Sequence, residues 1–337
     1  MTAAAIFGCA GPDLSGAERD FFRAVDPWGF ILFARNVESP DQVRALTAAL
    51  RESVGRDAPI LIDQEGGRVA RLRPPHWRGW PPALDTAAAA TLTEDERCEA
   101  LRLRYHLIGT ELAEVGIDVN CAPLLDLPVP GAHDIIGDRA LGATVEDVIR
   151  RGRAVHDGLL DAGVLPVIKH VPGHGRAGAD SHLALPRVST PLGELTATDF
   201  APFAALADAP LAMTAHIVYE ALDAGNCATL SPAVIEHMRG PMGLTGLLMS
   251  DDLSMKALDG DFATRTARAL AAGCDLVLHC NGHPAEMQAV APALAPLTGA
   301  AIARSDRALS LRRAGDADRA ESAARYAALA ERGGFHV

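Results

Sequence analysis

Lys169, His170, Asp180 and His182 are the residues of this 337-residue chain whose types and spacing most directly suggest chemistry. Lys169 and His170 end an apolar run, and Lys169 is one of only two lysines among 31 basic residues. Because almost all the other basic residues are arginines, a lysine at this position suggests that a compact cation is needed beside a substrate. Asp180 can orient and polarise His182 for proton transfer near neutral pH. The plainer alternative is a chance lysine at a rim and an Asp–His pair that only stabilises a loop.

Two further interpretations of the same segment are weaker. A zinc ion could be held by Asp180 and three histidines, namely His170, His174 and His182. Their spacing matches no common zinc motif, however. The pattern Gly173-x-Gly175-x-x-Gly178 imitates a dinucleotide fingerprint, which must open a helix, and residues 180–186 show no helical period. We therefore expect neither a metal nor a cofactor.

Adjacent carboxylates, Asp251 and Asp252, follow the apolar run 246–250. Side chains alternate along a strand, so the two carboxylates should point to opposite sides. One can enter a site while the other faces a helix layer or caps the next helix. Serine-based nucleophilic chemistry is not supported, because the chain has no Gly-x-Ser-x-Gly elbow.

Other polar side chains at strand ends suit a sugar. Asp63 ends an apolar run, and a glycine pair then turns the chain towards Arg68 and Arg71. These groups can hydrogen-bond hydroxyls, although a purely structural ion pair is the alternative. Arg139 and His216 add polar groups on the same face, and His216 alone would more often be a satisfied core histidine.

Eight short apolar runs, each followed by an amphipathic helical pattern, must position these residues. The runs are 4–8, 29–33, 60–63, 117–121, 166–170, 211–216, 246–250 and 274–279. The helical segments are 15–25, 41–54, 95–115, 145–162, 202–207, 232–238, 262–272 and 284–297. Buried strands that alternate with helices predict a parallel sheet, and eight such units predict a (β/α)8 TIM barrel in the α/β class.

The same pattern predicts the domain organisation and the active face. Residues 1–300 should form the catalytic barrel, and residues 301–337 a C-terminal helical extension packed on its exterior. Three long loops leave strands, at 64–94, 122–144 and 171–195. In such barrels the strand-to-helix loops build the active site.

Composition narrows the class of protein. The formal net charge is −12, which disfavours nucleic-acid binding, and 49% hydrophobic residues support a large core. No run of about 18 apolar residues predicts a membrane span. The six cysteines show no regular spacing and should be reduced core residues. Residues 6–9 faintly resemble a lipoprotein cleavage site, but no basic residue precedes them, so we expect a cytoplasmic protein.

Four ordered motifs together resemble glycoside hydrolase family 3, specifically its single-domain bacterial β-N-acetylglucosaminidases (β-hexosaminidases). They are Asp63-Gln-Glu-Gly-Gly-Arg-Val, Ile136-Gly-Asp-Arg, Lys169-His-Val-Pro-Gly-His-Gly with Asp180-Ser-His, and Ser250-Asp-Asp-Leu-Ser-Met. The resemblance extends from the first strand to about residue 297. Val171 and Ala70 depart from the usual Phe and Gln, which affects the expected shape of the pocket.

The resemblance implies a role for each matching residue. Asp251 would be the nucleophile, and His182 the general acid/base with Asp180 assisting. The implied substrate-binding residues are Asp63, Arg71, Arg139, Lys169 and His170, to which we add His216. Such enzymes are retaining hydrolases that remove N-acetylglucosamine from 1,6-anhydro-N-acetylmuramic acid fragments during cell-wall recycling, without a metal.

The expected partner is therefore a small muropeptide or amino sugar, and the expected protein is a monomer. Three alternatives stay open. They are a phosphorylase on the same scaffold, a metal-dependent TIM-barrel hydrolase, and a sugar-binding protein without catalysis. The last would have no need of Asp251 or of the Asp180–His182 pair.

Overall fold

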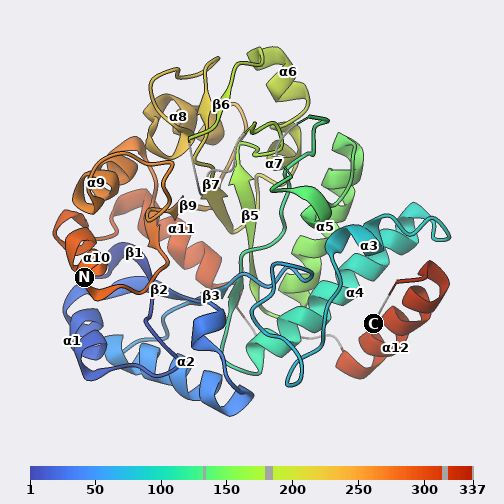
Figure 1. The fold of residues 1–337 in the computed structure, drawn as a ribbon, viewed down its shortest axis with the longest axis horizontal. Coiled ribbons are helices and arrows are strands. Elements are labelled where there is room, and N and C mark those ends of the chain that lie inside the picture. Colours follow the sequence, from blue (N-terminus) through green and yellow to red (C-terminus); the bar gives the residue numbers. More distant parts are fainter. Residues whose placement is uncertain (132–133, 179–184, 313–317, 336–337) are drawn as a thin grey trace.

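Eight parallel strands close into a barrel in the computed structural model, which describes residues 1–131, 134–178, 185–312 and 318–335 (Figure 1). The strands are β1 (Ala3–Gly8), β2 (Pro27–Leu32), β3 (Ile60–Ile62), β4 (Val119–Asn120), β5 (Leu165–Val171), β7 (Leu211–Thr214), β9 (Leu247–Asp252) and β10 (Leu276–His279). Their order around the barrel is β1-β10-β9-β7-β5-β4-β3-β2. Each predicted apolar run overlaps one of these strands, and the predicted TIM barrel is confirmed. A separate two-stranded sheet pairs β6 (Arg187–Val188) with β8 (Val218–Tyr219).

Helices surround the barrel, and several of them begin at a capping side chain. They are α1 (Gly16–Val25), α2 (Pro40–Val54), α3 (Ala83–Ala87), α4 (Glu94–Ala113), α5 (Val145–Asp161), α6 (Leu192–Ala197), α7 (Ala201–Ala205), α8 (Pro232–Arg239), α9 (Phe262–Ala272), α10 (Pro284–Val290), α11 (Gly299–Leu309) and α12 (Arg319–Gly333). Ser15, Ser39 and Thr93 each accept a hydrogen bond from a main-chain N–H of the first turn. The helix predicted at 284–297 ends at Val290, because Pro292 cannot donate the next helical hydrogen bond.

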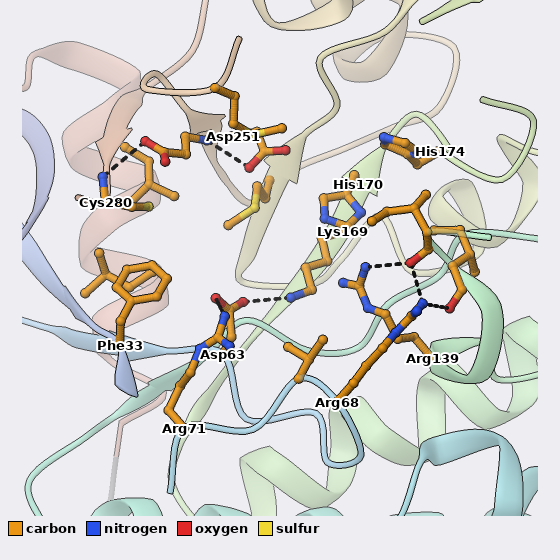
Figure 2. A pocket seen from close by; sticks show the side chains of 18 residues that line it. Phe33, Asp63, Arg68, Arg71, Arg139, Lys169, His170, His174, Asp251 and Cys280 are labelled. Carbon is orange, nitrogen blue, oxygen red and sulfur yellow. Dashed lines mark hydrogen bonds and ion pairs between the residues drawn. The ribbon is translucent and has the colours of Figure 1, made fainter. Parts of the chain in front are cut away.

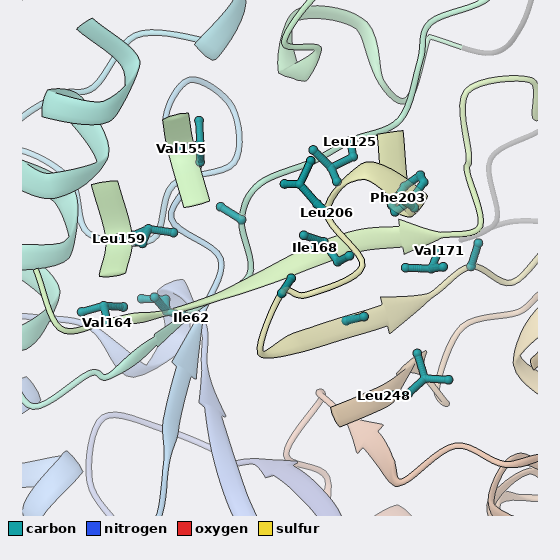
Figure 3. Close-up of a cluster of buried hydrophobic side chains, with 14 of the residues drawn as sticks. Ile62, Leu125, Val155, Leu159, Val164, Ile168, Val171, Phe203, Leu206 and Leu248 are labelled. Carbon is teal, nitrogen blue, oxygen red and sulfur yellow. The ribbon is translucent and has the colours of Figure 1, made fainter. Parts of the chain in front are cut away.

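The core has two layers. Alternate strand residues such as Leu61, Val167 and Met249 fill the barrel interior. The intervening residues, among them Ile62, Ile168 and Leu248, pack outwards against the helices (Figure 3). Strands buried on both faces explain why each appears in the sequence as a nearly continuous apolar run. The described cysteines form no disulfide, and all but Cys98 are buried.

Two helices follow the eighth strand–helix unit. In α11, Ser305 accepts a hydrogen bond of 2.8 Å from the Trp28 indole, and Ala308 joins the interior core. The last helix, α12, packs along α4, where Arg325 forms a two-point ion pair with Glu99 (Figure 1). The division of the chain at residue 300 stays a prediction. Among the described residues, no helix combines the length and apolar character that a membrane crossing needs.

Candidate active site

Polar side chains lie at one end of the barrel, at or directly after the last residues of three strands. Lys169 continues the inward-facing series of Val167 in β5, Asp63 follows β3 directly, and Asp251 lies near the end of β9. All three line a cavity of about 350 Å³. In Figure 2, Asp251 lies on one side of the side chains that line the cavity, and Asp63 and Arg71 lie on the opposite side. The cavity lies at the C-terminal ends of the strands, where barrel enzymes place their active sites.

An ion-pair cluster forms one wall of the cavity. The Lys169 Nζ lies 2.8 Å from Asp63 Oδ1 and 2.6 Å from Glu65 Oε1. Glu65 also receives Arg139 through two hydrogen bonds of 2.8 and 2.9 Å. The guanidinium of Arg71 lies 3.2 Å from Asp63 Oδ2. Four predicted sugar-binding residues therefore meet, and Glu65, which we had not predicted as a site residue, joins two of them.

The acidic and basic side chains of this ion-pair cluster stay ionised. Burial alone would raise the pKa of Asp63, but Lys169 and Arg71 hold that pKa below its usual value. Burial also opposes ionisation of Glu65, and Lys169 with Arg139 lowers the pKa of its carboxyl well below the usual range. Burial opposes the charge of Lys169 as well, and Asp63 and Glu65 outweigh it and raise the pKa of the ammonium. Charged donors and acceptors held rigidly side by side suit the hydroxyl groups of a sugar.

A second buried carboxylate supports His170. Asp126 Oδ2 lies 2.8 Å from His170 Nδ1, and its Oδ1 accepts the main-chain N–H of His174 at 2.6 Å. Burial would raise the pKa of Asp126, but His170 lowers it. Burial, and next the neighbouring His170, lowers the pKa of His174 to about 4, so its ring stays neutral near pH 7. We had not predicted Asp126, although a single charged residue within the apolar stretch 121–129 was a signal.

The two adjacent aspartates differ in their hydrogen bonds. The Asp252 carboxylate is held in place by hydrogen bonds, because it accepts the main-chain N–H groups of Ser254 at 3.0 Å and Cys280 at 3.1 Å. Strand alternation predicts opposite sides for the two residues, but both border the cavity, and the register of β9 with β10 shifts between Met249 and Asp252. The main-chain N–H of Asp251 donates to Thr214 Oγ1 at 3.2 Å. The contacts of the Asp252 carboxylate hold it to the loops after β9 and β10, and the nucleophile role of Asp251 stays a prediction.

His216 lies behind Asp251 and Asp252, away from the cavity. The ring is completely buried and does not line the cavity. Its Nε2 donates to the main-chain carbonyl of Asp252 at 3.0 Å, and its Nδ1 lies 2.7 Å from Thr229 Oγ1. Burial lowers the pKa of His216, which favours the neutral ring that these bonds require. The contact of His216 with substrate stays a prediction. The hydrogen bonds of its ring to Asp252 and Thr229 hold the end of β9.

Asp180 and His182, the predicted acid/base pair, lie outside the described residues, so their assignment stays a prediction. The preceding residues are well anchored. Arg176 pairs with Asp199 at 2.6 Å, and the Tyr219 hydroxyl donates to the Gly173 carbonyl. Within the part of the chain that the structure describes, no three His, Cys, Asp or Glu side chains converge as metal ligands.

Comparison with known proteins shows the family of the chain. Residues 26–309 match the model of the glycosyl hydrolase family 3 N-terminal domain. A β-hexosaminidase of Methylococcus capsulatus is 42% identical over 284 residues, which are 82% of each chain. The crystal structure of NagZ from Neisseria gonorrhoeae with N-trifluoroacetyl-D-glucosamine is 28% identical and superposes with a TM-score of 0.85, covering 99% of this chain and 98% of that one.

A family 3 β-N-acetylglucosaminidase from a Paenibacillus species is 31% identical, with a TM-score of 0.79. The alignment covers 98% of this chain but only 61% of that protein. The family predicted from the four motifs is confirmed by the family model and by the curated relatives. The chain therefore belongs to glycosyl hydrolase family 3 and is a glycosidase of the β-hexosaminidase type.

Proposed function

We propose that the protein is a retaining hydrolase that removes terminal β-linked N-acetylglucosamine, and that its substrates are 1,6-anhydro-N-acetylmuramic acid fragments, with or without peptide. The observation that carries the proposal is that Asp251, at the end of β9, lines the same cavity as the Asp63–Lys169 pair. Similarity to β-hexosaminidases, and to a NagZ that was crystallised with an N-acylglucosamine, supports the sugar.

The residues divide into binding and reacting groups. Asp63, Arg71, Arg139, Lys169 and His170 bind the hydroxyl groups and fix the ring of the sugar. The Asp251 carboxylate attacks the anomeric carbon and forms a glycosyl ester while the glycosidic bond breaks. His182, oriented by Asp180, gives its proton to the departing oxygen and then removes a proton from the water that cleaves the ester. Two inversions at the same carbon return the β configuration.

Phosphorolysis and binding without catalysis are the competing functions. Phosphate could replace water in the second step, because a neutral histidine repels an anion less than a second carboxylate would. A sugar-binding protein would use Asp63 and Arg139 and would not need Asp251. Each alternative gives a different result in the same assay.

The deciding experiment follows turnover of an aryl β-N-acetylglucosaminide with and without phosphate, with EDTA as the metal control. We expect free N-acetylglucosamine in both buffers, at a rate that EDTA does not change. Proton NMR of the first products should show the β-anomer. Formation of the sugar 1-phosphate would establish a phosphorylase, and loss of activity in EDTA a metal enzyme. No turnover would support the binding protein.

The substrate is tested separately with two natural disaccharides. N-acetylglucosaminyl-1,6-anhydro-N-acetylmuramic acid and chitobiose share the same terminal sugar and differ in the leaving group. We expect a higher kcat/KM for the muramic acid compound. Equal values would contradict the assignment to cell-wall fragments and leave a general N-acetylglucosaminidase.

A further inference from the structure

Glu65 is the residue through which the two sides of the sugar-binding cluster are connected. Its carboxylate contacts Lys169, which comes from β5, and Arg139, which comes from the loop after β4. The side chain is 5% exposed. Any change in the position of the Glu65 main chain would therefore move two cations that the proposed function assigns to the sugar.

The main chain of Glu65 is held from the side of helix α4. Its carbonyl accepts a hydrogen bond of 3.0 Å from Arg104 Nη2 and one of 2.9 Å from the Tyr105 hydroxyl. Both donors are buried, with exposed fractions of 0% and 2%. The Glu65 N–H donates to the Val69 carbonyl at 2.9 Å, so this residue is fixed at both its main-chain groups.

Arg104 is unusual because its charge is compensated by carbonyls. Its other partners are the carbonyls of Pro81 and Pro82 and the hydroxyl of Thr86. None of the ion pairs among the described residues includes Arg104. Burial of a guanidinium without a carboxylate partner is unfavourable, and main-chain carbonyls offset only part of the cost. The guanidinium thus joins Glu65 at the start of the β3 loop to Pro81 and Pro82 further along it.

Gly66 shows how closely the loop is fitted to Arg104. Its φ of +96° lies in the left-handed region, and a Cβ there would approach Arg104 Nη2 to 2.2 Å. The guanidinium occupies the space that a side chain at this position would need. Arg104 therefore packs directly against the loop at the residue after Glu65.

We propose that Arg104 and Tyr105 are positioning residues for sugar binding, which act by holding the main chain of Glu65 so that its carboxylate orients Lys169 and Arg139. The inference rests on the proposed function, in which these two cations bind the sugar. Neither Arg104 nor Tyr105 lines the cavity, so their effect must pass through Glu65. The alternative is that both residues contribute only to the stability of the core.

The test compares Tyr105→Phe and Arg104→Lys with matched controls. Tyr326→Phe removes the hydroxyl of another buried tyrosine, and Arg151→Lys changes a buried arginine that pairs with Glu94. The readouts are Tm, the Kd of N-acetylglucosamine by calorimetry, and kcat and KM for an aryl β-N-acetylglucosaminide. We expect the Kd and KM to rise about fivefold in Tyr105→Phe, as for one lost hydrogen bond, and further in Arg104→Lys. We expect an unchanged Kd in both controls, and a lower Tm in Arg151→Lys, which weakens the ion pair with Glu94.

A double variant shows whether the effect passes through Glu65. Glu65→Gln alone should weaken sugar binding, and adding Tyr105→Phe to it should cause little further loss. If Arg104→Lys does not fold, Tyr105→Phe carries the test. An unchanged Kd in Tyr105→Phe, or losses that multiply in the double variant, would overturn the positioning role while the proposed function stands. If Glu65→Gln itself leaves the Kd unchanged, the sugar-binding role of the cluster is wrong, and this inference is overturned with it.

Discussion

The carboxylate of Asp126 orients the imidazole of His170, with 2.8 Å between Oδ2 and Nδ1. The other oxygen of Asp126 accepts the main-chain N–H groups of His174 at 2.6 Å and of His170 at 3.3 Å. One completely buried carboxylate thus fixes both a side chain of the cavity wall and the start of the segment that leads to the predicted acid/base residues.

Replacement of Asp126 by Asn should therefore cost both stability and sugar binding. The amide group would turn an N–H donor towards either the ring or the main-chain donors, so at least one hydrogen bond to a charged group is lost. We expect the free energy of unfolding to fall by about 2 kcal/mol and the KM for an aryl β-N-acetylglucosaminide to rise. Urea denaturation and steady-state kinetics measure the two effects. Asp208→Asn, at an exposed carboxylate, is the control, and equal behaviour of the two variants would contradict the role of Asp126.

A closed set of hydrogen bonds holds the main chain on both sides of Asp251. The Asp251 N–H donates to Thr214, and the Thr214 hydroxyl lies 2.8 Å from that of Thr229. Thr229 contacts His216 Nδ1, and His216 Nε2 donates to the Asp252 carbonyl. The network assigns the ring proton to Nε2 and lets Thr229 donate to Nδ1.

Thr229→Val removes the central hydroxyl of this network and keeps the shape of the side chain. Because Asp251 would lose precise placement, we expect kcat to fall about tenfold or more while the Kd of N-acetylglucosamine stays the same. Thr266→Val is the control, since Thr266 is equally buried and its hydroxyl bonds only within its own helix. A similar loss of kcat in both variants would show that the effect is one of general stability.

The lowered pKa of His174 predicts how stability depends on pH. Below about pH 6.5 the unfolded chain binds a proton at this histidine, whereas the folded protein does so only near pH 4. The free energy of unfolding should therefore fall as the pH decreases from 6.5 to 4, by up to about 3 kcal/mol from this group, and be unaffected by it above 6.5. Urea denaturation of His174→Gln should show a shallower decline in this window. His76→Gln, at an exposed histidine, should follow the wild-type curve; coincidence of all three curves would contradict the prediction.

The strands could be predicted from sequence because they depend on a local pattern. Each barrel strand is buried on two faces, so it appears as an apolar run. Alternation predicts that Asp251 and Asp252 point to opposite sides, yet both line the cavity, and the register of β9 with β10 shifts between Met249 and Asp252. Alternation also predicts that Lys169 and His170 point to opposite sides. Both nevertheless line the cavity, because the register of β5 with β7 shifts between Lys169 and Val171.

Glu65 and Asp126 were missed for a different reason. Each lies on a loop, and its partners come from distant parts of the chain, at separations of 74 residues for Arg139 and 44 for His170. No pattern within either loop indicates which cation will lie beside it. Only the closure of the barrel brings the loops after β3, β4 and β5 together, so such pairs follow from the fold and not from local spacing.

Asp251 is expected to form the covalent intermediate. Asp251→Asn should fold normally and lose turnover by several kcal/mol of transition-state stabilisation, a factor of about 10³ or more. A mechanism-based fluoro-sugar should label the wild-type protein on the peptide that contains Asp251. Asp252→Asn should instead lower Tm, because the amide nitrogen cannot accept the Ser254 hydroxyl as Oδ2 does, while labelling at Asp251 persists. Label found on Asp252 would contradict the assignment.

The role of His182 is tested by a difference between two substrates. A sugar is a poor leaving group that needs a proton, whereas a nitrophenolate leaves readily without one. His182→Ala should therefore slow glycosylation by the natural disaccharide much more than by an activated aryl glycoside. General acid catalysis is typically worth about 10²–10⁴-fold, so the gap between the substrates should lie in that range.

The same variant also loses the base of the second step. With the activated substrate, His182→Ala should accumulate the glycosyl-enzyme, and azide, which needs no base, should accelerate its breakdown. Asp180→Asn should change both steps in the same direction but less strongly, because it alters the orientation and basicity of an imidazole that is still present. Equal slowing of both substrates, with no effect of azide, would show that His182 is not the acid/base. His170, which lines the cavity beside Lys169, would then be the histidine to examine by the same comparison.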